Sequence, residues 1–365
     1  MNVPPPRSSI IFSSESGWPH PEMGGGFFLL ISAPGAANFS MATGLCYRCA
    51  YDFCPFPMTL LVVVAALLLD LYVIVALRGK FDALLQRYAE FVRHALDAGE
   101  HRVVVFAWLA VVVPIMVVSI AVYGLLYSIS PALAWILNVA VLFALLHLKR
   151  TLDHLNAMSA ALRHEDFAAA HTLLGAWRGI AVQGLDSGTL ARLTIERALI
   201  DIHRHLLAPV FWFVVLPGPS GPLLYWAAAL LADYWSEIKR DTSPALSAFA
   251  RKVFYWIDWL PQRLTAISFA VAGNFEDAVY CWRSQAREWP DDASGVLLAS
   301  GAGAMGVKLG DPISSEQGVE FRPEIGSGET AHADHLRSTE GLIWRTVVVW
   351  LGVLALFTVA GWVGR

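Results

Sequence analysis

The chain has 365 residues, of which 56% are hydrophobic and only 15% are charged, and its mean hydropathy is +0.53. This composition is too apolar for a soluble globular protein, and it predicts a polytopic membrane protein whose first partner is the lipid bilayer. The formal net charge of -4 is small for this length, so neither a nucleic-acid-binding surface nor an acidic tail is expected.

The first 57 residues differ from the rest of the chain because they are rich in Pro, Gly and Ser and lack a sustained hydrophobic period. We expect residues 1–57 to be a disordered or mis-annotated extension, with Met58 as the alternative start, and residues 58–365 to form the membrane domain. Cys46 and Cys49 form a CxxC pair, but no second pair accompanies it. Chance thiols in an unstructured tail are therefore favoured over a metal or redox site.

Apolar segments in the remaining chain predict an all-α fold, a polytopic transmembrane helix bundle of about five spans with helical loops. Its central element is a hairpin of two apolar runs joined by PGPSGP, a sequence that favours a tight reversal. Each run is shorter than the ~20 residues of a full span, so we expect a tilted or re-entrant hairpin, or helical flanks. The predicted spans lie near residues 59–77, 103–127, 133–147, 206–235 (the hairpin) and 342–363.

The distribution of Lys and Arg predicts the orientation of the spans. Connections 78–102, 147–205 and 236–341 are rich in these residues, whereas the turns at 128–131 and 216–221 contain none. Loops that carry excess positive charge stay on the cytoplasmic side. We therefore expect a multi-pass protein of the inner membrane, with its long loops in the cytoplasm.

Carboxylates in or beside the apolar runs are candidate site residues. A charge at membrane depth costs roughly 2.5–3.5 kcal/mol, so Asp70 is either a substrate-site or ion-pair carboxylate, or one satisfied by a neighbouring helix. Near the hairpin, Glu196 with Arg204 and Asp233 with Lys239 are either ligand-binding groups or ion pairs that hold the hairpin mouth. Both interpretations remain open at this point.

Metal and nucleotide motifs are weak in this sequence. His147, His154, His164 and His171 recur in one segment, but their spacings form no HxxxH or HxxE pair, so we expect exposed or capping histidines and no metal ligands. The glycine-rich stretch GAGAMG at 301–306 lacks the Lys-Ser/Thr of a P-loop. No motif of the sequence therefore predicts an ATP site by itself.

Six phrases carry a resemblance to a known family. They are ALLLD ending at Asp70, GLDS at 184–187, Glu196 twelve residues before Ala208-Pro209, DWLPQRL at 258–264, GAMGVKLGDP at 303–312 and RPEIGSG at 322–328. Together they resemble the CobD/CbiB family of integral membrane proteins, and the similarity covers most of the chain after Met58. Enzymatic members of that family are adenosylcobinamide-phosphate synthases of cobalamin biosynthesis. The resemblance implies ATP and Mg as cofactors, a corrinoid as substrate, and an amide bond that attaches an aminopropanol arm to it.

The resemblance also implies roles for individual residues. Catalytic roles fall on Glu196, Asp201, Asp233 and Arg263, and substrate-binding roles on Asp70, Asp186, Arg204 and Asp258. The chain departs from the synthases after Glu196, because Ile200, Asp201 and Arg204 stand where they have Glu, Asn and Asp. Whether the chain is an active amide ligase is therefore open.

Two other phrases are more similar to the related AmpE proteins. These phrases are LAPVFWFVV at 207–215 and IDWLPQRLTAISFAVAGNFEDAVYCW at 257–282. AmpE proteins are associated with signalling linked to cell-wall damage and the beta-lactam response. This resemblance implies the alternative function, a non-enzymatic membrane sensor or modulator that binds another small molecule.

Overall fold

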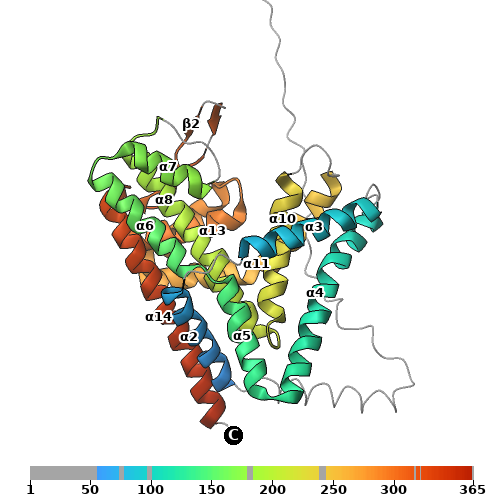
Figure 1. The fold of residues 1–365 in the computed structure, drawn as a ribbon. Helices are drawn as coiled ribbons and strands as arrows, with labels where there is room; N and C mark the ends of the chain where they lie inside the picture. Colours follow the sequence, from blue (N-terminus) through green and yellow to red (C-terminus); the bar gives the residue numbers. More distant parts are fainter. Residues whose placement is uncertain are drawn as a thin grey trace, which may run out of the picture. The chain divides into compact units, whose positions relative to one another are not determined.

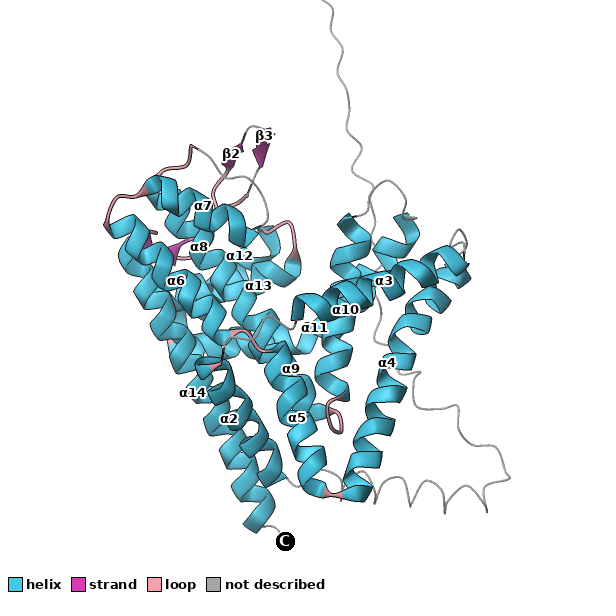
Figure 2. Ribbon diagram, in the orientation of Figure 1, coloured by secondary structure: helices cyan, strands magenta, loops and turns pink. Residues whose placement is uncertain are grey.

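The computed structural model describes residues 56–73, 78–96, 101–178, 184–237, 244–315, 318–320 and 322–363. These residues are almost entirely helical, which confirms the predicted all-α class (Figure 1, Figure 2). The extension expected for residues 1–57 lies outside the described residues except for its last two, which begin helix α2.

The described helices include stretches that can cross a membrane. Four are long and apolar enough, namely Val104–Ile129, Pro131–Arg163, Ser187–Val215 and Ala333–Val363, and the apolar helix Met58–Tyr72 is shorter. Large hydrophobic side chains such as Val118 and Leu356 are exposed on these helices, as expected for surfaces that face lipid. The protein is thus a polytopic membrane helix bundle, and the number of long apolar helices roughly fits the predicted five spans.

A helical hairpin forms one side of the bundle. Helix α4 (His101–Ile129) continues through Pro114 and turns at Ser130 into α5 (Pro131–Leu145). Pro131 occupies the first turn of α5, where its missing N–H costs no intrahelical hydrogen bond. Helix α2 (Phe56–Tyr72) packs between α5 and the long α14 (Ala333–Val363), as Figure 1 shows.

The central helical stretch contains a π-helical turn with an identifiable cause. It comprises α8 (Ser187–Ile202), the π-helix η1 (His203–Leu207) and α9 (Ala208–Val215). Pro209 cannot donate to the carbonyl of His205, which instead accepts a hydrogen bond of 3.3 Å from the backbone N–H of His147. The Ala208 N–H bonds to the more distant carbonyl of His203, which is the π pattern. Proline chemistry therefore explains the widened turn.

The predicted hairpin turn lies between α9 and α10 (Ser220–Glu237). Gly218 has a φ of 63°, a conformation that disfavours other side chains. A Cβ on Gly221 would lie 2.0 Å from the carbonyl oxygen of Trp212, so the two helices can approach only at a glycine. The first run of the hairpin is the end of the stretch Ser187–Val215, whereas α10 is not among the four helices long and apolar enough to cross a membrane.

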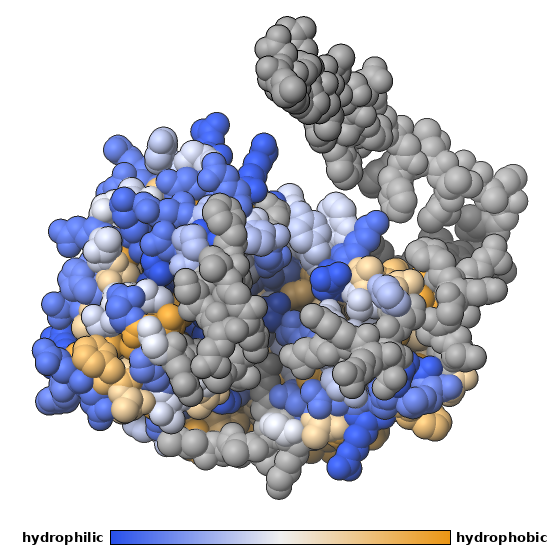
Figure 3. Space-filling model, turned by 90° about the horizontal axis from the view of Figure 1, so that it is seen from above, coloured by the Kyte–Doolittle hydropathy of each residue, from blue (hydrophilic) through white to orange (hydrophobic). Residues whose placement is uncertain are grey.

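Amphipathic and shorter elements make up the more polar part of the described chain. They are α3 (Arg78–Leu96), α6 (Leu148–Arg163), α7 (Phe167–Arg178), α11 (Pro244–Ala272), α12 (Phe275–Gln285), η2 (Ala286–Glu288), α13 (Asp292–Met305), β1 (Val307–Lys308), β2 (Ile313–Ser315), β3 (Gly318–Glu320) and β4 (Glu329–Thr330). Strand β1 pairs with β4 in parallel, and β2 pairs with β3 antiparallel. Figure 3 shows the molecule from above, and hydrophilic side chains cover much of the coloured surface in this view, with smaller hydrophobic areas among them.

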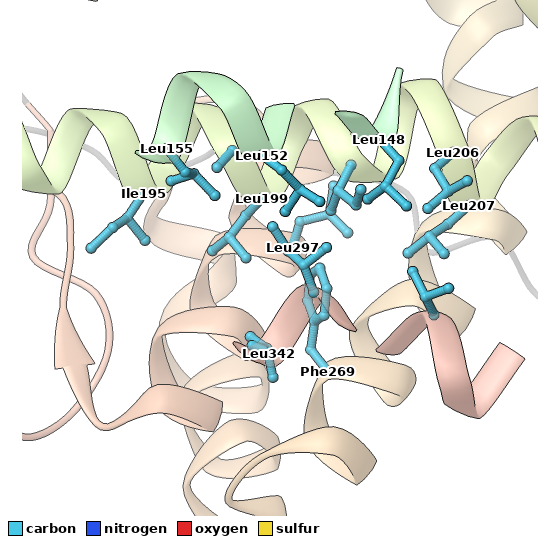
Figure 4. Close-up of a cluster of buried hydrophobic side chains, with 14 of the residues drawn as sticks. Leu148, Leu152, Leu155, Ile195, Leu199, Leu206, Leu207, Phe269, Leu297 and Leu342 are labelled. Carbon is cyan, nitrogen blue, oxygen red and sulfur yellow. The ribbon is translucent and has the colours of Figure 1, made fainter. Parts of the chain in front are cut away.

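One of three clusters of buried hydrophobic side chains in the described chain packs several polar elements against spanning helices, and Figure 4 shows part of it. Among its buried members are residues of α6, α8, η1, α11, α13 and α14, namely Leu148, Leu152, Leu155, Ile195, Leu199, Leu206, Leu207, Phe269, Leu297 and Leu342. Burying a leucine or phenylalanine side chain contributes about 1.5–3 kcal/mol, so this core fixes the course of the stretch from α8 to α9. That stretch carries the candidate site.

Candidate functional site

The π-helical turn sends consecutive side chains of one helical stretch towards different neighbours. His203 points to α11, where it meets Asp258 and Thr265, whereas Arg204 points to Asp233 of α10. Short π-helical turns occur often at functional sites because they re-aim side chains without ending the helix. The turn therefore marks the place where polar groups of three helices meet.

A polar cavity of 210 Å³ lies beside this turn, and we refer to it as the Arg204 cavity. The lining residues with polar side-chain groups are Asp82, Gln86, Arg204, His205, Tyr225, Trp226, Asp233 and Tyr234. Arg204 Nη1 donates to Asp233 Oδ2 at 2.9 Å, and the Trp226 indole N–H donates to Asp82 Oδ1 at 2.7 Å. The arginine side chain is 33% exposed and that of Asp233 is 55% exposed, so a ligand can reach both.

A buried hydrogen-bond network supports the floor of the Arg204 cavity. His203 places Nε2 2.9 Å from Asp258 Oδ1 and Nδ1 2.9 Å from Thr265 Oγ1. Tyr225, which lines the cavity, donates its hydroxyl proton to the same oxygen of Asp258 at 2.9 Å. Burial acts to raise the pKa of Asp258, but His203, the hydroxyl of Tyr225 and Arg204 together hold that pKa below its usual value. Asp258 is therefore a buried carboxylate that holds the cavity-lining Tyr225 in place through a hydrogen bond.

Glu196 lies in a second, separate cluster. Its carboxylate accepts from the backbone N–H of Gly310 at 2.9 Å and forms a buried ion pair with Arg322, whose guanidinium lies 4.8 Å from the ring centroid of Trp289. Glu196, Gly310 and Arg322 belong to three of the phrases that carry the family resemblance. Glu196 and Arg322 are 126 residues apart in the chain. The three phrases therefore encode residues that meet in one buried cluster. The pair proposed from sequence between Glu196 and Arg204 does not form.

Asp201 and Arg263 each have local partners of their own. Asp201 accepts from the indole N–H of Trp177 at 2.7 Å and lies 3.1 Å from Nε of Arg197. Arg263 donates to the carbonyl of Trp259 at 3.0 Å, with its guanidinium 4.0 Å from the centroid of that indole. Neither residue lines the Arg204 cavity. Their catalytic roles remain predictions.

Asp70 and Asp186 both cap helix N-termini. Asp186 accepts from the backbone N–H groups of Gly188 and Thr189 at the start of α8, and the hydroxyl of Thr189 is the main cause that holds its pKa below the usual value. Asp70 accepts from the backbone N–H of Lys149 at 3.0 Å, in the first turn of α6. Asp70 is thus satisfied by a neighbouring helix, and both carboxylates stabilise orphan N–H groups.

The structure brings three of the eight predicted site residues together, namely Arg204, Asp233 and, through Tyr225, Asp258. Sequence reasoning did not identify His205 or Asp82, both of which line the cavity. Asp82 is one of several charged residues on an amphipathic helix. It also missed Arg322, whose partner is remote in the chain. Lys239, the partner expected for Asp233 from the sequence, lies outside the described residues, and the structure pairs Asp233 with Arg204.

Comparison with known proteins gives the family. A family model described as CobD/Cbib protein matches residues 62–343. This range contains all the residues named above for the Arg204 cavity and for the Glu196 cluster. The chain belongs to the CobD/CbiB family. This match confirms the resemblance found in the six sequence phrases.

Relatives with the name cobalamin biosynthesis protein CobD share much of this length. The protein of Stutzerimonas stutzeri is 29% identical over 309 residues, which cover 82% of this chain and 97% of the relative. The protein of Chromobacterium violaceum is 30% identical over 220 residues, 60% of this chain and 70% of the relative. The protein of Brucella anthropi is 27% identical over 264 residues, 67% and 79% respectively. No solved structure matches this CobD/CbiB chain.

Proposed function

We propose that this CobD/CbiB-family protein acts in cobalamin biosynthesis, as a membrane-bound synthase that attaches an aminopropanol arm to a corrinoid through an amide bond. The observation that carries the proposal is the similarity to the Stutzerimonas stutzeri protein named cobalamin biosynthesis protein CobD, which extends over 97% of that relative. The three relatives described above are all named cobalamin biosynthesis protein CobD, and none of them supports the AmpE-like alternative.

The size of the Arg204 cavity limits what enters it. Pockets that enclose a whole drug-sized ligand have volumes of about 300–1,000 Å³, whereas this cavity has 210 Å³. A small polar group, such as a phosphate or the amine of the arm, fits inside, while the corrinoid itself stays outside. Arg204 is the group that binds phosphate, because a guanidinium offers five donors and can bind a second anion while one nitrogen keeps Asp233.

The same cavity has the oxygen ligands that magnesium prefers. Asp82, Asp233 and the amide of Gln86 line it together, and Mg²⁺ usually binds through one or two carboxylates plus the phosphates of a nucleotide. These residues would hold the magnesium ion and a phosphate group of Mg-ATP, with the rest of the nucleotide outside the cavity, and the bound nucleotide would supply the phosphoryl group that activates the corrinoid carboxyl group. Asp233 orients the attacking amine and accepts its proton as the amide C–N bond forms and inorganic phosphate leaves the activated carboxyl carbon, and Arg204 holds the phosphate of the arm. Glu196 and Asp201 are positioning residues in this scheme.

The proposed reaction requires the Arg204 cavity to face the compartment that contains ATP. The connections rich in Lys and Arg contain α3, α6 to α8 and α11 to α13. By the positive-inside rule we place α3, α7 and α11 to α13 on the cytoplasmic side of the inner membrane, together with the ends of α6 and α8 that lead to α7. The rest of α6 and α8 belongs to the long apolar stretches Pro131–Arg163 and Ser187–Val215. A tag in the connection between α6 and α7 should then be inaccessible to a membrane-impermeant reagent in intact cells.

Complementation tests the proposed function. The gene should restore corrinoid maturation in a cobinamide-amidation mutant, and Arg204→Ala and Asp233→Asn should abolish this rescue at unchanged membrane abundance. Arg251→Ala is the matched control, because that arginine is exposed on α11 and does not line the cavity. Rescue by both cavity variants would overturn the site, and failure of the unmodified gene would overturn the function.

A further inference from the structure

Three potential metal ligands converge where β4 leads into α14. Glu329 lies on β4, His332 lies in the short connection, and His335 lies in the first turn of α14. The ligand atoms of the three side chains all lie within 4.8 Å of one another, and the two imidazole centroids are 3.9 Å apart. Ligand atoms around one tetrahedral zinc ion, each about 2.0–2.2 Å from it, are about 3.3–3.6 Å apart, so the three side chains have to move together by up to about 1.5 Å to bind one ion. Exposed side chains at Glu329 and His332 can make the remaining adjustment.

The hydrogen bonds of the two histidines leave one lone pair open on His332 and one only weakly engaged on His335. His332 Nδ1 lies 3.1 Å from the carbonyl oxygen of Thr330, which can only accept, so Nδ1 carries the proton and Nε2 has the lone pair. An imidazole that donates its other N–H to a backbone carbonyl is the usual arrangement of a metal-bound histidine. His335 Nδ1 accepts a long bond of 3.3 Å from the backbone N–H of His332, and a cation can replace this weak donor.

We propose that Glu329, His332 and His335 bind a divalent cation of the zinc class. Two imidazoles and one carboxylate suit Zn²⁺ or Co²⁺, whereas Mg²⁺ and Ca²⁺ prefer oxygen ligands alone. The neighbouring Asp334 is engaged by Arg163 at 2.9 Å, so the fourth position is left to water. Two histidines, one carboxylate and one water form an open site, unlike the closed sites of structural zinc.

The position of this site suggests what the cation does for the fold. A Cβ on Gly188 would lie 3.4 Å from the carbonyl oxygen of Ala331, so the connection before α14 lies against the start of α8. Helix α8 leads into η1, which carries Arg204. All three ligands lie within residues 329–335, so a bound cation fixes the connection between β4 and α14, and this connection lies against the start of the helical stretch that carries Arg204.

Metal titration of the purified full-length protein tests this proposal without any measurement of enzyme activity. The parent for all variants carries Cys46→Ser, Cys49→Ser and Cys54→Ser, so that these thiols cannot bind the probe. Zn²⁺ binding is measured by calorimetry, and Co²⁺ binding by its visible absorption. We expect one ion per chain, and an affinity at least tenfold weaker in each of His332→Ala, His335→Ala and Glu329→Gln.

A matched control separates this site from ordinary surface groups. His94 is exposed and lies 2.9 Å from Glu90, so His94→Ala removes a histidine beside a carboxylate without touching the three proposed ligands. It should bind zinc as the parent does. The proposal is wrong if the parent shows no saturable binding, if binding survives in the His332→Ala, His335→Ala double variant, or if His94→Ala alone weakens it equally. If His335→Ala does not fold, the exposed His332 decides the outcome.

Discussion

The buried pair of Glu196 and Arg322 allows a sharp test of whether Glu196 is a structural or a catalytic residue. Both side chains are buried, at 7% and 4% exposure, and the carboxylate also accepts from Gly310. Glu196→Gln removes the negative charge and leaves Arg322 buried without a counter-charge, which costs about 3–5 kcal/mol of unfolding free energy. Because 1 kcal/mol shifts Tm by about 2–4 °C in proteins of 150–250 residues, and less in longer chains, we expect a fall of roughly 5–15 °C.

The assay is thermal unfolding of the purified protein in detergent, with two comparison variants. Glu324→Gln removes a carboxylate from the exposed pair with Lys308 and should change the unfolding free energy by only about 0–1 kcal/mol. Glu196→Gln combined with Arg322→Met should recover much of the lost stability, because no unpaired charge remains. A Glu196→Gln protein that melts like the parent but has lost activity would refute this reasoning and favour the catalytic role.

Three further predictions concern single contacts. Asp186→Ala removes the N-cap of α8 and should cost about 1 kcal/mol. The pKa of Asp186 is lower in the folded state than in the unfolded state. In the parent, the stabilisation by this cap is therefore complete above the ordinary aspartate pKa and is lost as the pH falls through the lowered pKa. Thermal melts recorded against pH should show this dependence for the parent and not for Asp186→Ala. Leu342→Ala creates a cavity in the core shown in Figure 4 and should cost about 2–5 kcal/mol, measured by the same melts. Tyr225→Phe deletes one hydrogen bond to the buried Asp258 and should cost about 1–3 kcal/mol, and an unchanged Tm would contradict that network.

Hydropathy and short phrases predict the fold class well because both are local properties. Apolar runs have to satisfy their backbone groups within one helix, so the helices α2, α4, α5 and α14 follow directly from composition. The turn PGPSGP likewise predicts the reversal between α9 and α10. The family phrases were sufficient to predict the CobD/CbiB match over residues 62–343.

The site is harder to predict because its contacts join residues that are far apart in the chain. Glu196 meets Arg322 across 126 residues, and Asp82 meets Trp226 across 144. No local pattern distinguishes Asp82 from the other charges of α3. The cluster around His332 was also missed, since its ligands follow a change from strand to helix and not the HxxxH spacing of one helix.

The most direct test of the central claim is a measurement of amide formation by isolated membranes that contain the protein. With a corrinoid carboxylic acid, aminopropanol phosphate and Mg-ATP supplied, mass spectrometry should detect the amide product with the parent and with Arg251→Ala. The Arg204→Ala protein should form almost none at equal abundance, because the cavity of 210 Å³ has lost the guanidinium group that we propose binds phosphate. Product formed by Arg204→Ala at the parent's rate would contradict the account.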